Sequence, residues 1–396
     1  MQHPEWTGEG FAPAREIAAL RDVLASDEAR MCARLRRPTM TWVTGALCVV
    51  IGIVGIVQGV GAVIGWNDRL LAWSAVGFEH TVLDGAWWTP FTAAFTHVGL
   101  GHLGVNLPLL AYCGYRTERV LGAWGAASVL AGALLGSTVA ILLWSDLPVV
   151  GASTLAYGLW GAQIAIGFRF GPLVPRELQS RYGIGNLVLF LPLAFMSLFD
   201  GPGVSLVGHA GGLVGGALAG VSCNPLAPSR GRWLTAAALV ATGLLPLAPV
   251  TLWSGLWSRT EVSEQATITL PSRWLEHTGR FWGMHAWSSG DRYPVFAGTF
   301  VARGEGDTPL AERERALWGD WLRGAATVSA EGDAVRIVVD NAEEPWVIIE
   351  RVVEHDGLRT RAGYLLPPAC VAPGTCSGRR SLGDGVIASL LTTAGS

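Results

Sequence analysis

Long apolar runs separated by short polar connections occupy residues 40–257, and polar residues dominate on either side of that region. A helix needs about 20 apolar residues to cross a bilayer core about 30 Å thick. On this rule we expect seven membrane-spanning helices, at residues 40–64, 92–114, 118–144, 152–169, 185–199, 204–222 and 233–257. The pattern predicts an all-α polytopic membrane protein, with a short fifth span that is tilted or partly sunk.

The pattern changes near residue 258, where a separate soluble domain begins. Three runs rich in β-branched residues predict strands at Val295–Val301, Ala334–Val339 and Val347–Val353. Asp356-Gly357 is a hairpin turn signal, and Thr308-Pro309 followed by Glu312 predicts a helix that runs to Arg323. We therefore expect a small C-terminal α+β domain.

Composition supports the membrane class. Of the 396 residues, 50% are hydrophobic and 15% are charged, and the mean hydropathy is +0.38, which is too apolar for a pair of soluble domains. The net charge of −3 and the scattered arginines argue against a nucleic-acid partner. The six cysteines lack Cys-x-x-Cys spacing. No cleavable signal peptide is expected, because the first apolar run is long enough to span and has no small-residue cleavage site behind it.

Arginines mark one side of the membrane. Alternate connections carry acidic residues instead, and the positive-inside rule then places the N-terminus in the cytoplasm and the C-terminal tail outside. Cys370 and Cys376 lie close together in that tail, where an oxidising exterior would let them pair. The basic connections hold Arg116, Arg119, Arg169, Arg176, Arg181, Arg230 and Arg232, and the acidic ones hold Asp68, Glu79, Asp84, Asp146 and Asp200.

Ionisable side chains inside a bilayer are costly, so each one needs a partner or a function. Three histidines occur in the expected spans: His97 and His102 at the start of the second, and His209 in the sixth. His102 and Asn106 are four residues apart and therefore share one helical face. His97 need not share that face.

Ser153 begins the fourth expected span among small residues, in Gly151-Ala152-Ser153-Thr154. A helix from Ser153 to Phe168 is about 24 Å long, shorter than the bilayer core, so Ser153 is expected below the outer surface. The free N–H groups at this helix end need protein or water as partners. Buried donors beside a serine are what an oxyanion hole requires.

The sixth expected span provides a base at the same depth. Its glycines recur every fourth residue and let another helix approach closely. His209 adjoins the first of them, so a hydrogen bond with Ser153 is feasible, and Tyr157 lies one turn below Ser153, placed to pack on the imidazole. No carboxylate lies in either span, which predicts a Ser–His dyad. These glycines are Gly208, Gly212, Gly216 and Gly220.

These residues together resemble the rhomboid intramembrane serine proteases. The motifs that carry the resemblance are Trp87-Trp88, His97-x4-His102-x3-Asn106, Gly114-x3-Glu118-x3-Gly122, Gly151-x-Ser153 with Tyr157, and His209-x2-Gly212-x3-Gly216. The resemblance covers residues 40–222 and implies a six-helix bundle. The expected parts are then a cytoplasmic segment at 1–38, a rhomboid-like six-helix core at 39–225, a linker with a seventh transmembrane helix at 226–257, and an extracytoplasmic α+β domain at 258–396.

The resemblance implies a serine endopeptidase of the cell membrane that cleaves transmembrane segments of protein substrates and needs no cofactor or metal. Ser153 corresponds to the nucleophile and His209 to the general base, while His102 and Asn106 hold the oxyanion with the Ser153 N–H. The supporting positions are Tyr157, His97, Gly151, Gly212 and Gly216.

Two departures from the family pattern and two alternative functions remain. Thr154 stands where the family usually has Gly, which narrows the space beside Ser153, and Thr89 stands where many members have Arg, which affects the anchoring of a loop. The first alternative is a catalytically inactive rhomboid-like protein that binds membrane clients. In the second, His97, His102 and His209 ligate a metal or haem, although no carboxylate or cysteine completes such a site.

Overall fold

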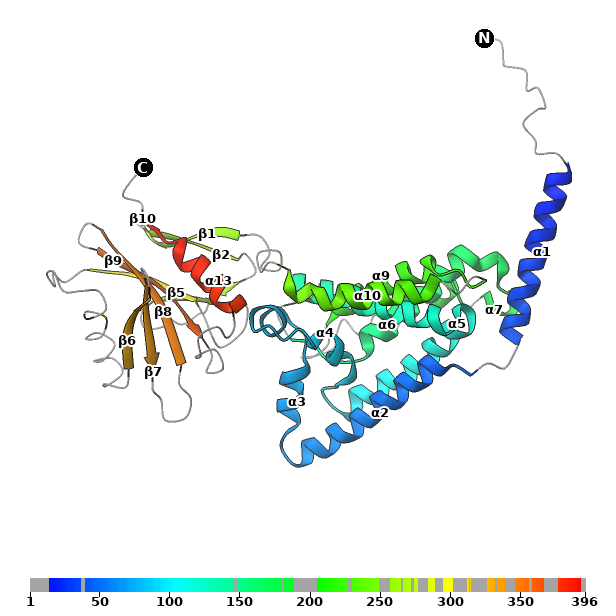
Figure 1. Cartoon of the computed structure of the whole chain (residues 1–396), viewed down its shortest axis with the longest axis horizontal. Helices are drawn as coiled ribbons and strands as arrows, with labels where there is room; N and C mark the ends of the chain where they lie inside the picture. Colours follow the sequence, from blue (N-terminus) through cyan, green and yellow to red (C-terminus); the bar gives the residue numbers. More distant parts are fainter. Residues whose placement is uncertain are drawn as a thin grey trace, which may run out of the picture. The chain divides into compact units, whose positions relative to one another are not determined.

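In a computed structural model the chain forms two compact units (Figure 1). The first comprises Met1–Ser74, Phe91–Ala140 and Val150–Thr242, and the second comprises Ala75–Pro90, Ile141–Val149 and Gly243–Ser396. The structure describes residues 14–36, 40–145, 148–179, 181–188, 205–226, 230–248, 257–264, 266–271, 274–276, 284–288, 295–301, 312, 314, 326–331, 334–339, 346–355, 358–366 and 377–392.

The first unit is helical. It begins with α1 (Ala14–Arg36) and α2 (Trp42–Val63), and α2 matches the first expected span closely. The helix α3 (Asn67–Ser74) follows. The second expected span, at 92–114, begins later than predicted, because residues 89–95 form the short helices α4 (Thr89–Thr92) and η2 (Ala93–Phe95). The long helix α5 then runs over Leu100–Trp144.

A kink in α5 separates the second expected span from the third. The break lies at Gly122, whose φ of +77° is a left-handed conformation that glycine adopts readily. Arg116 and Arg119, which were expected at a polar connection, are helical, and Arg116 is buried together with Thr117 and Glu118. The chain therefore passes from the second expected span into the third as helix and not as a loop.

The later helices lie close to the expected spans where they are described. The fourth is α6 (Ser153–Phe170), followed by η3 (Gly171–Leu173) and α7 (Arg176–Gln179). Residues 184–188 are helical, and the rest of the fifth expected span lies outside the described residues. The sixth is α9 (Leu206–Ser222). The seventh is α10 (Gly231–Leu244), extended by η5 (Leu245–Leu247), and 249–256 are not described.

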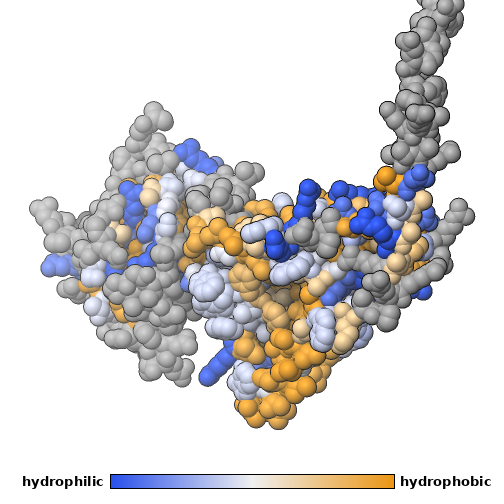
Figure 2. All heavy atoms as spheres, turned by 45° about the vertical axis from the view of Figure 1, so that its right-hand side comes forward, coloured by the Kyte–Doolittle hydropathy of each residue, from blue (hydrophilic) through white to orange (hydrophobic). Residues whose placement is uncertain are grey.

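Within the described residues, α2 and α5 are long and apolar enough to cross a membrane, whereas Leu206–Ser222 and Gly231–Leu247 are shorter apolar segments. Figure 2 shows apolar side chains over much of the visible surface of the helical unit. Large exposed apolar residues of α2 include Val49, Ile53, Ile56, Val60 and Val63. A soluble monomer rarely exposes so continuous an apolar surface, which is typical of a helix in contact with lipid or with another protein.

Glycines bring α9 into backbone contact with two other helices. A Cβ added to Gly212 or Gly216 would overlap the carbonyl oxygen of Thr154 or Gly158 on α6. On the neighbouring face, a Cβ on Gly211 or Gly215 would overlap a backbone oxygen of α5. In an apolar solvent such close approach replaces the hydrophobic effect as the main source of helix association.

A buried carboxylate holds α2 against α5. Glu118 accepts hydrogen bonds from the backbone N–H groups of Val43 (3.1 Å) and Thr44 (2.9 Å), and from the Thr44 hydroxyl (2.8 Å). These N–H groups are in the first turn of α2, where no intrahelical acceptor exists. A negative charge at this end of the helix also interacts favourably with the helix dipole.

The second unit contains two antiparallel sheets. The larger one has the strand order β3-β4-β5-β9-β8-β7-β6 among the described residues, and the smaller has the order β1-β2-β10. The strands are β1 (Trp257–Ser263), β2 (Ala266–Pro271), β3 (Leu275–Glu276), β4 (His285–Ser288), β5 (Val295–Val301), β6 (Ala326–Glu331), β7 (Ala334–Val339), β8 (Trp346–His355), β9 (Leu358–Leu366) and β10 (Leu391–Thr392).

The three strands expected from the sequence are confirmed as β5, β7 and most of β8. His355 pairs with Leu358, so β8 and β9 form a hairpin whose connection is Asp356-Gly357, as predicted. The helix α13 (Ser377–Ala388) buries Val386 and Ile387 in the core on one face of the sheet. Most of the expected helix up to Arg323, and both Cys370 and Cys376, lie outside the described residues.

One buried cation in this unit contacts two buried carboxylates. The Arg361 guanidinium on β9 donates two hydrogen bonds to Glu314, at 2.6 and 2.9 Å, and one to Glu350 of β8 at 3.1 Å. The side chains of both glutamates have no exposed surface, and that of Arg361 is 6% exposed. Burial of these charges is tolerated because each carboxylate is paired with the guanidinium.

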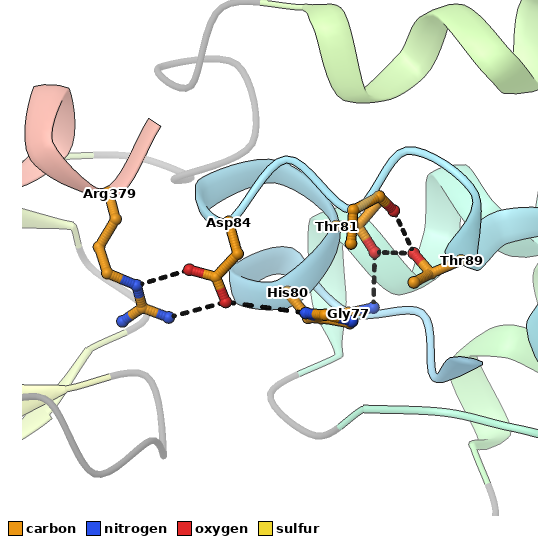
Figure 3. A network of polar contacts seen from close by, with 7 residues as sticks. Gly77, His80, Thr81, Asp84, Thr89 and Arg379 are labelled. Atoms are coloured by element: carbon orange, nitrogen blue, oxygen red, sulfur yellow. Dashed lines mark hydrogen bonds and ion pairs between the residues drawn. The ribbon is translucent and has the colours of Figure 1, made fainter. Parts of the chain in front are cut away.

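The segment 75–90 belongs to the second unit and includes one turn of π-helix, η1 (Phe78–Leu83). Asp84, which follows η1, accepts a hydrogen bond at 2.9 Å from Arg379 of α13 (Figure 3). Burial alone would raise the pKa of Asp84, but the hydrogen bond from His80 and the charge of Arg379 outweigh it, so the pKa lies below its usual value.

Candidate active site

Ser153 and His209 meet in the helical unit, although they are 56 residues apart in the sequence. Ser153 is the first residue of α6, and His209 lies in the first turn of α9, where Ser205 caps the helix by accepting a hydrogen bond from Gly208 N. Their Oγ and Nε2 atoms are 2.7 Å apart, and both residues are buried. This geometry lets the imidazole accept the hydroxyl proton when Nε2 is unprotonated.

Tyr157 fixes the plane of the imidazole. Its ring stacks on His209 with centroids 4.2 Å apart and an interplanar angle of 4°. Among the described residues the Nδ1 atom of His209 has no hydrogen-bond partner. Aromatic stacking thus takes the place in which a carboxylate commonly orients a catalytic histidine.

His102 and Asn106 converge on Gly151 from the first two turns of α5. An ideal Cβ on Gly151 would lie 2.8 Å from Cε1 of His102 and 3.7 Å from Nδ2 of Asn106. The φ of Gly151 is +125°, a conformation that favours glycine. Within the described part of the chain, the buried amide nitrogen of Asn106 has no hydrogen-bond partner. A donor of this kind is available for an oxygen that enters the site.

His97 was predicted to lie at the start of the second span. In the structure it precedes α5, which begins at Leu100. Its Nε2 accepts a hydrogen bond from the backbone N–H of Ala152 at 3.3 Å, and its ring meets that of His102 edge to face at 5.4 Å. His97 therefore supports the turn that leads into Ser153. It contacts the backbone there and does not reach the Ser153 hydroxyl.

Gln58 is a residue of this region that sequence reasoning missed. Its amide lies on α2 and clamps the backbone of His97, accepting from the N–H and donating to the carbonyl, each at 3.0 Å. It also donates to Asn67 at 3.3 Å. A lone amide in an otherwise apolar span was the available signal, since such a group needs a partner in lipid.

Thr154 and Thr89 occupy the two positions that depart from the expected pattern. Thr154 is buried, and the 2.7 Å contact between Ser153 and His209 forms with this threonine in place. The Thr89 hydroxyl lies 2.6 Å from that of Thr81 and donates to the carbonyl of Ala86 at 2.9 Å (Figure 3). Thr89 therefore anchors its loop by short hydrogen bonds.

A serine hydroxyl beside an imidazole can serve as a nucleophile with an adjacent base. The Nε2 atoms of His97 and His209 already contact Ala152 and Ser153. No group of three or more His, Cys, Asp or Glu side chains suited to a metal occurs among the residues that the structure describes. The geometry gives no support to a site in which these histidines ligate a metal.

Comparison with protein sequences gives matches to rhomboid proteins. The rhomboid domain model matches residues 84–225. The chain is 24% identical to rhomboid protease GluP of Bacillus subtilis over 71% of this chain and 54% of that protein. It is 29% identical to RHOMBOID-like protein 7 of Arabidopsis thaliana over 38% of this chain and 45% of that protein. Rhomboid-like protease 2 of Toxoplasma gondii is 30% identical over 41% of this chain and 57% of that protein.

The chain spans about half the length of these curated relatives. The matched region contains α5, α6 and α9, the helices that carry His102, Ser153 and His209. The chain therefore contains a rhomboid domain, over residues 84–225.

Proposed function

We propose that this protein is an intramembrane serine endopeptidase that cleaves transmembrane segments of other membrane proteins. The observation that carries the proposal is the 2.7 Å contact between Ser153 Oγ and His209 Nε2 at a buried site. Rhomboid proteases act within membranes on transmembrane substrates, and residues 84–225 match their domain.

His209 acts as the general base in the first step. It takes the proton from Ser153 while the serine oxygen attacks the substrate carbonyl, and the bond to the leaving amine breaks when His209 returns the proton to that amine. Water then attacks the acyl-enzyme. His209 takes a proton from this water and gives it to Ser153 Oγ as the bond between that oxygen and the acyl group breaks. Stacking on Tyr157 keeps the imidazole aligned during both transfers.

The oxyanion is held beside Gly151. The side chains of His102 and Asn106 border this space, and the N–H of Ser153 is free of intrahelical bonds because α6 begins there. Donors fixed before the reaction stabilise the developing charge without reorganisation, and the loss of one reduces the rate by roughly 10²–10³-fold. Asn106→Ala should show a loss of this size.

We further propose a multi-pass protein of the cell membrane with a cytoplasmic N-terminus and an extracytoplasmic C-terminal domain. Arg116, on the side expected to be cytoplasmic, packs on the rings of Tyr112 and Tyr182 at 5.1 and 5.0 Å. Aromatic and basic residues of this kind are typical of a membrane interface. Substrates then meet the dyad near the outer ends of their helices.

Reconstituted proteolysis tests the proposal. Wild type, Ser153→Ala and His209→Ala are incorporated into liposomes with a helical membrane substrate, and cleavage is followed with time. Ser222→Ala, which changes an exposed serine at the end of α9, is the matched control. We expect Ser153→Ala to lose activity by at least about 10⁴-fold and the control to retain it. Equal cleavage by wild type and Ser153→Ala would refute a serine mechanism.

A second candidate is a rhomboid-like protein that binds membrane clients without cleaving them. Thr154 favours it, because a branched residue follows Ser153 where the family usually has glycine. Absence of cleavage by wild type, Ser153→Ala and Thr154→Gly, with substrate binding retained, would favour this role. A gain of activity in Thr154→Gly would instead identify a slow protease.

A further inference from the structure

Trp160 lies behind the tyrosine that holds the catalytic histidine. It is three residues after Tyr157 on α6, is 4% exposed, and packs edge-on against the Tyr157 ring with centroids 5.5 Å apart. The three aromatic rings of His209, Tyr157 and Trp160 thus form a continuous row. The Trp160 indole packs against Tyr157 and so limits how far the tyrosine ring can move away from the His209 imidazole.

The indole itself is fixed on its polar edge. Its Nε1–H donates to the backbone carbonyl of Asn186 at 3.3 Å, and the Asn186 amide donates to Gln163 at 3.2 Å. Gln163 in turn donates to the carbonyl of Cys113 on α5 at 2.8 Å. Asn186 and Gln163 have no exposed surface. The position of Trp160 is therefore set by a buried hydrogen-bonded network that connects α6 with α5 and residue 186.

The histidine depends on this support to an unusual degree. His209 has no acceptor for Nδ1 in the described part of the chain, so no hydrogen bond there resists rotation of its ring. Its ring is oriented by the Ser153 hydroxyl and by the Tyr157 stack. If the Tyr157 ring can move, the His209 imidazole stacked on it can also change its orientation.

We propose that Trp160 is a positioning residue for the Ser153–His209 pair and acts through Tyr157. The proposal rests on the proposed function for its effect on rate, but not for its effect on the orientation of His209. A misplacement of about 1 Å can cost on the order of 10²-fold in rate, and partial loosening of the stack is expected to cost about tenfold.

The test compares Trp160→Leu, which removes the ring, with Trp160→Phe, which keeps an aromatic edge and loses the N–H. Trp144→Leu, at an exposed position at the end of α5, is the control. In liposomes we expect Trp160→Leu to lower kcat about tenfold with KM unchanged. Trp160→Phe should stay within about threefold of wild type, as should Trp144→Leu. If Trp160→Leu does not fold, Trp160→Met keeps most of the volume without a ring.

A second readout does not require activity. NMR of the full chain, with isotope-labelled histidine, detects the imidazole signals of His209. These signals are assigned by their loss in His209→Ala. The stacked Tyr157 ring changes their chemical shifts. We expect Trp160→Leu to move these signals toward those of Tyr157→Ala. Unchanged His209 signals in Trp160→Leu would overturn the positioning role, whatever happens to kcat. If wild type does not cleave the substrate, the proposed protease function fails. The NMR comparison still decides whether Trp160 positions His209.

Discussion

The two units of this protein bring their elements together in different ways. In the helical unit α9 contacts α5 and α6 through glycines, backbone against backbone. In the sheet unit the helix α13 meets the larger sheet through side chains such as Val386, Ile387 and Tyr364. Side chains can change rotamer, whereas two backbones in contact have no such freedom. The position of His209 relative to Ser153 is accordingly fixed by residues without side chains.

Both units contain buried polar groups, some paired and some without a partner in the described part of the chain. The sheet unit pairs its buried Arg361 with two carboxylates. Among the described residues, the Asn106 amide and His209 Nδ1 in the helical unit have no partner, and neither has Trp274 Nε1 in the sheet unit. Unsatisfied buried groups are expensive and need an explanation. Asn106 and His209 lie close to Gly151 and Ser153, where a reacting oxygen would use the Asn106 amide.

The largest expected effect comes from inserting a side chain into the backbone contact. Gly216→Val places carbon atoms on the Gly158 carbonyl of α6, which cannot move away, so we expect a loss of more than about 4 kcal/mol of stability and of all activity. Gly298→Ala is the matched change in the sheet unit, where the added carbon meets the flexible Met284 side chain. It should cost about 1–3 kcal/mol. Hydrogen exchange of α9 and β5 peptides measures both.

If hydrogen exchange of α9 in Gly216→Val is the same as in wild type, α9 does not depend on backbone contact with α6. Destabilisation of Gly298→Ala as severe as that of Gly216→Val would erase the difference between the two units. Gly45→Ala is a control for the intrinsic effect of replacing a helical glycine, because an added Cβ there meets nothing within 4 Å.

Removal of a buried cation is the second largest effect. Arg361→Met leaves Glu314 and Glu350 without the guanidinium, and breaking a buried pair in this way costs about 3–5 kcal/mol. Faster hydrogen exchange in β8 and β9, with α6 and α9 unaffected, is the expected result. The double variant Glu314→Gln with Arg361→Met should recover part of the loss, and failure to do so would mean that packing rather than charge dominates there.

A polar change in the helical unit should cost less. Glu118→Gln keeps one acceptor oxygen for the N-terminus of α2 but removes the charge, so we expect a loss of about 1–3 kcal/mol. Thermal unfolding in detergent measures this loss. The exposed Glu28→Gln on α1 is the control. Equal melting temperatures for the two variants would show that the Glu118 carboxylate is not stabilising α2.

The smallest effect is expected at Asp84. The ion pair with Arg379 is partly exposed, so Asp84→Asn should cost about 1 kcal/mol or less. Because the folded pKa is depressed, the pair's contribution is complete above the ordinary pKa near 4 and is lost as the pH falls through the lower folded value. Protection of residues 78–83 against hydrogen exchange, corrected for intrinsic rates, should therefore be constant from pH 5 to 8. A transition within that range would contradict the assignment of this stabilisation to the Asp84–Arg379 pair.

Local patterns predicted the sheet unit well. The strand at Ala334–Val339 was indicated by its β-branched residues, and the turn signal Asp356-Gly357 falls between two paired strands, β8 and β9. Both features depend on neighbours along the chain. The order of the seven strands and the ion pairs of Arg361 depend on distant residues and were not predictable.

Span boundaries in the helical unit were less predictable. Hydropathy is continuous across residues 92–100, so nothing in the composition marked the short helices before Leu100. The bend at Gly122 was hidden for a related reason: glycine is common in this chain, with 52 in total, and only the local backbone shows which one adopts a positive φ.

The sequence by itself determined the chemistry that is available: a serine at a helix start, histidines and an asparagine in apolar surroundings, and glycines at intervals of four. The tertiary structure alone decided that Ser153 and His209 meet at 2.7 Å, that His97 lies before α5 with Gln58 on its backbone, and that Trp160 supports Tyr157. The physical reason is one of precision. Side-chain spacing along a helix follows from its geometry, whereas contacts between helices depend on how closely their backbones approach, to within tenths of an ångström.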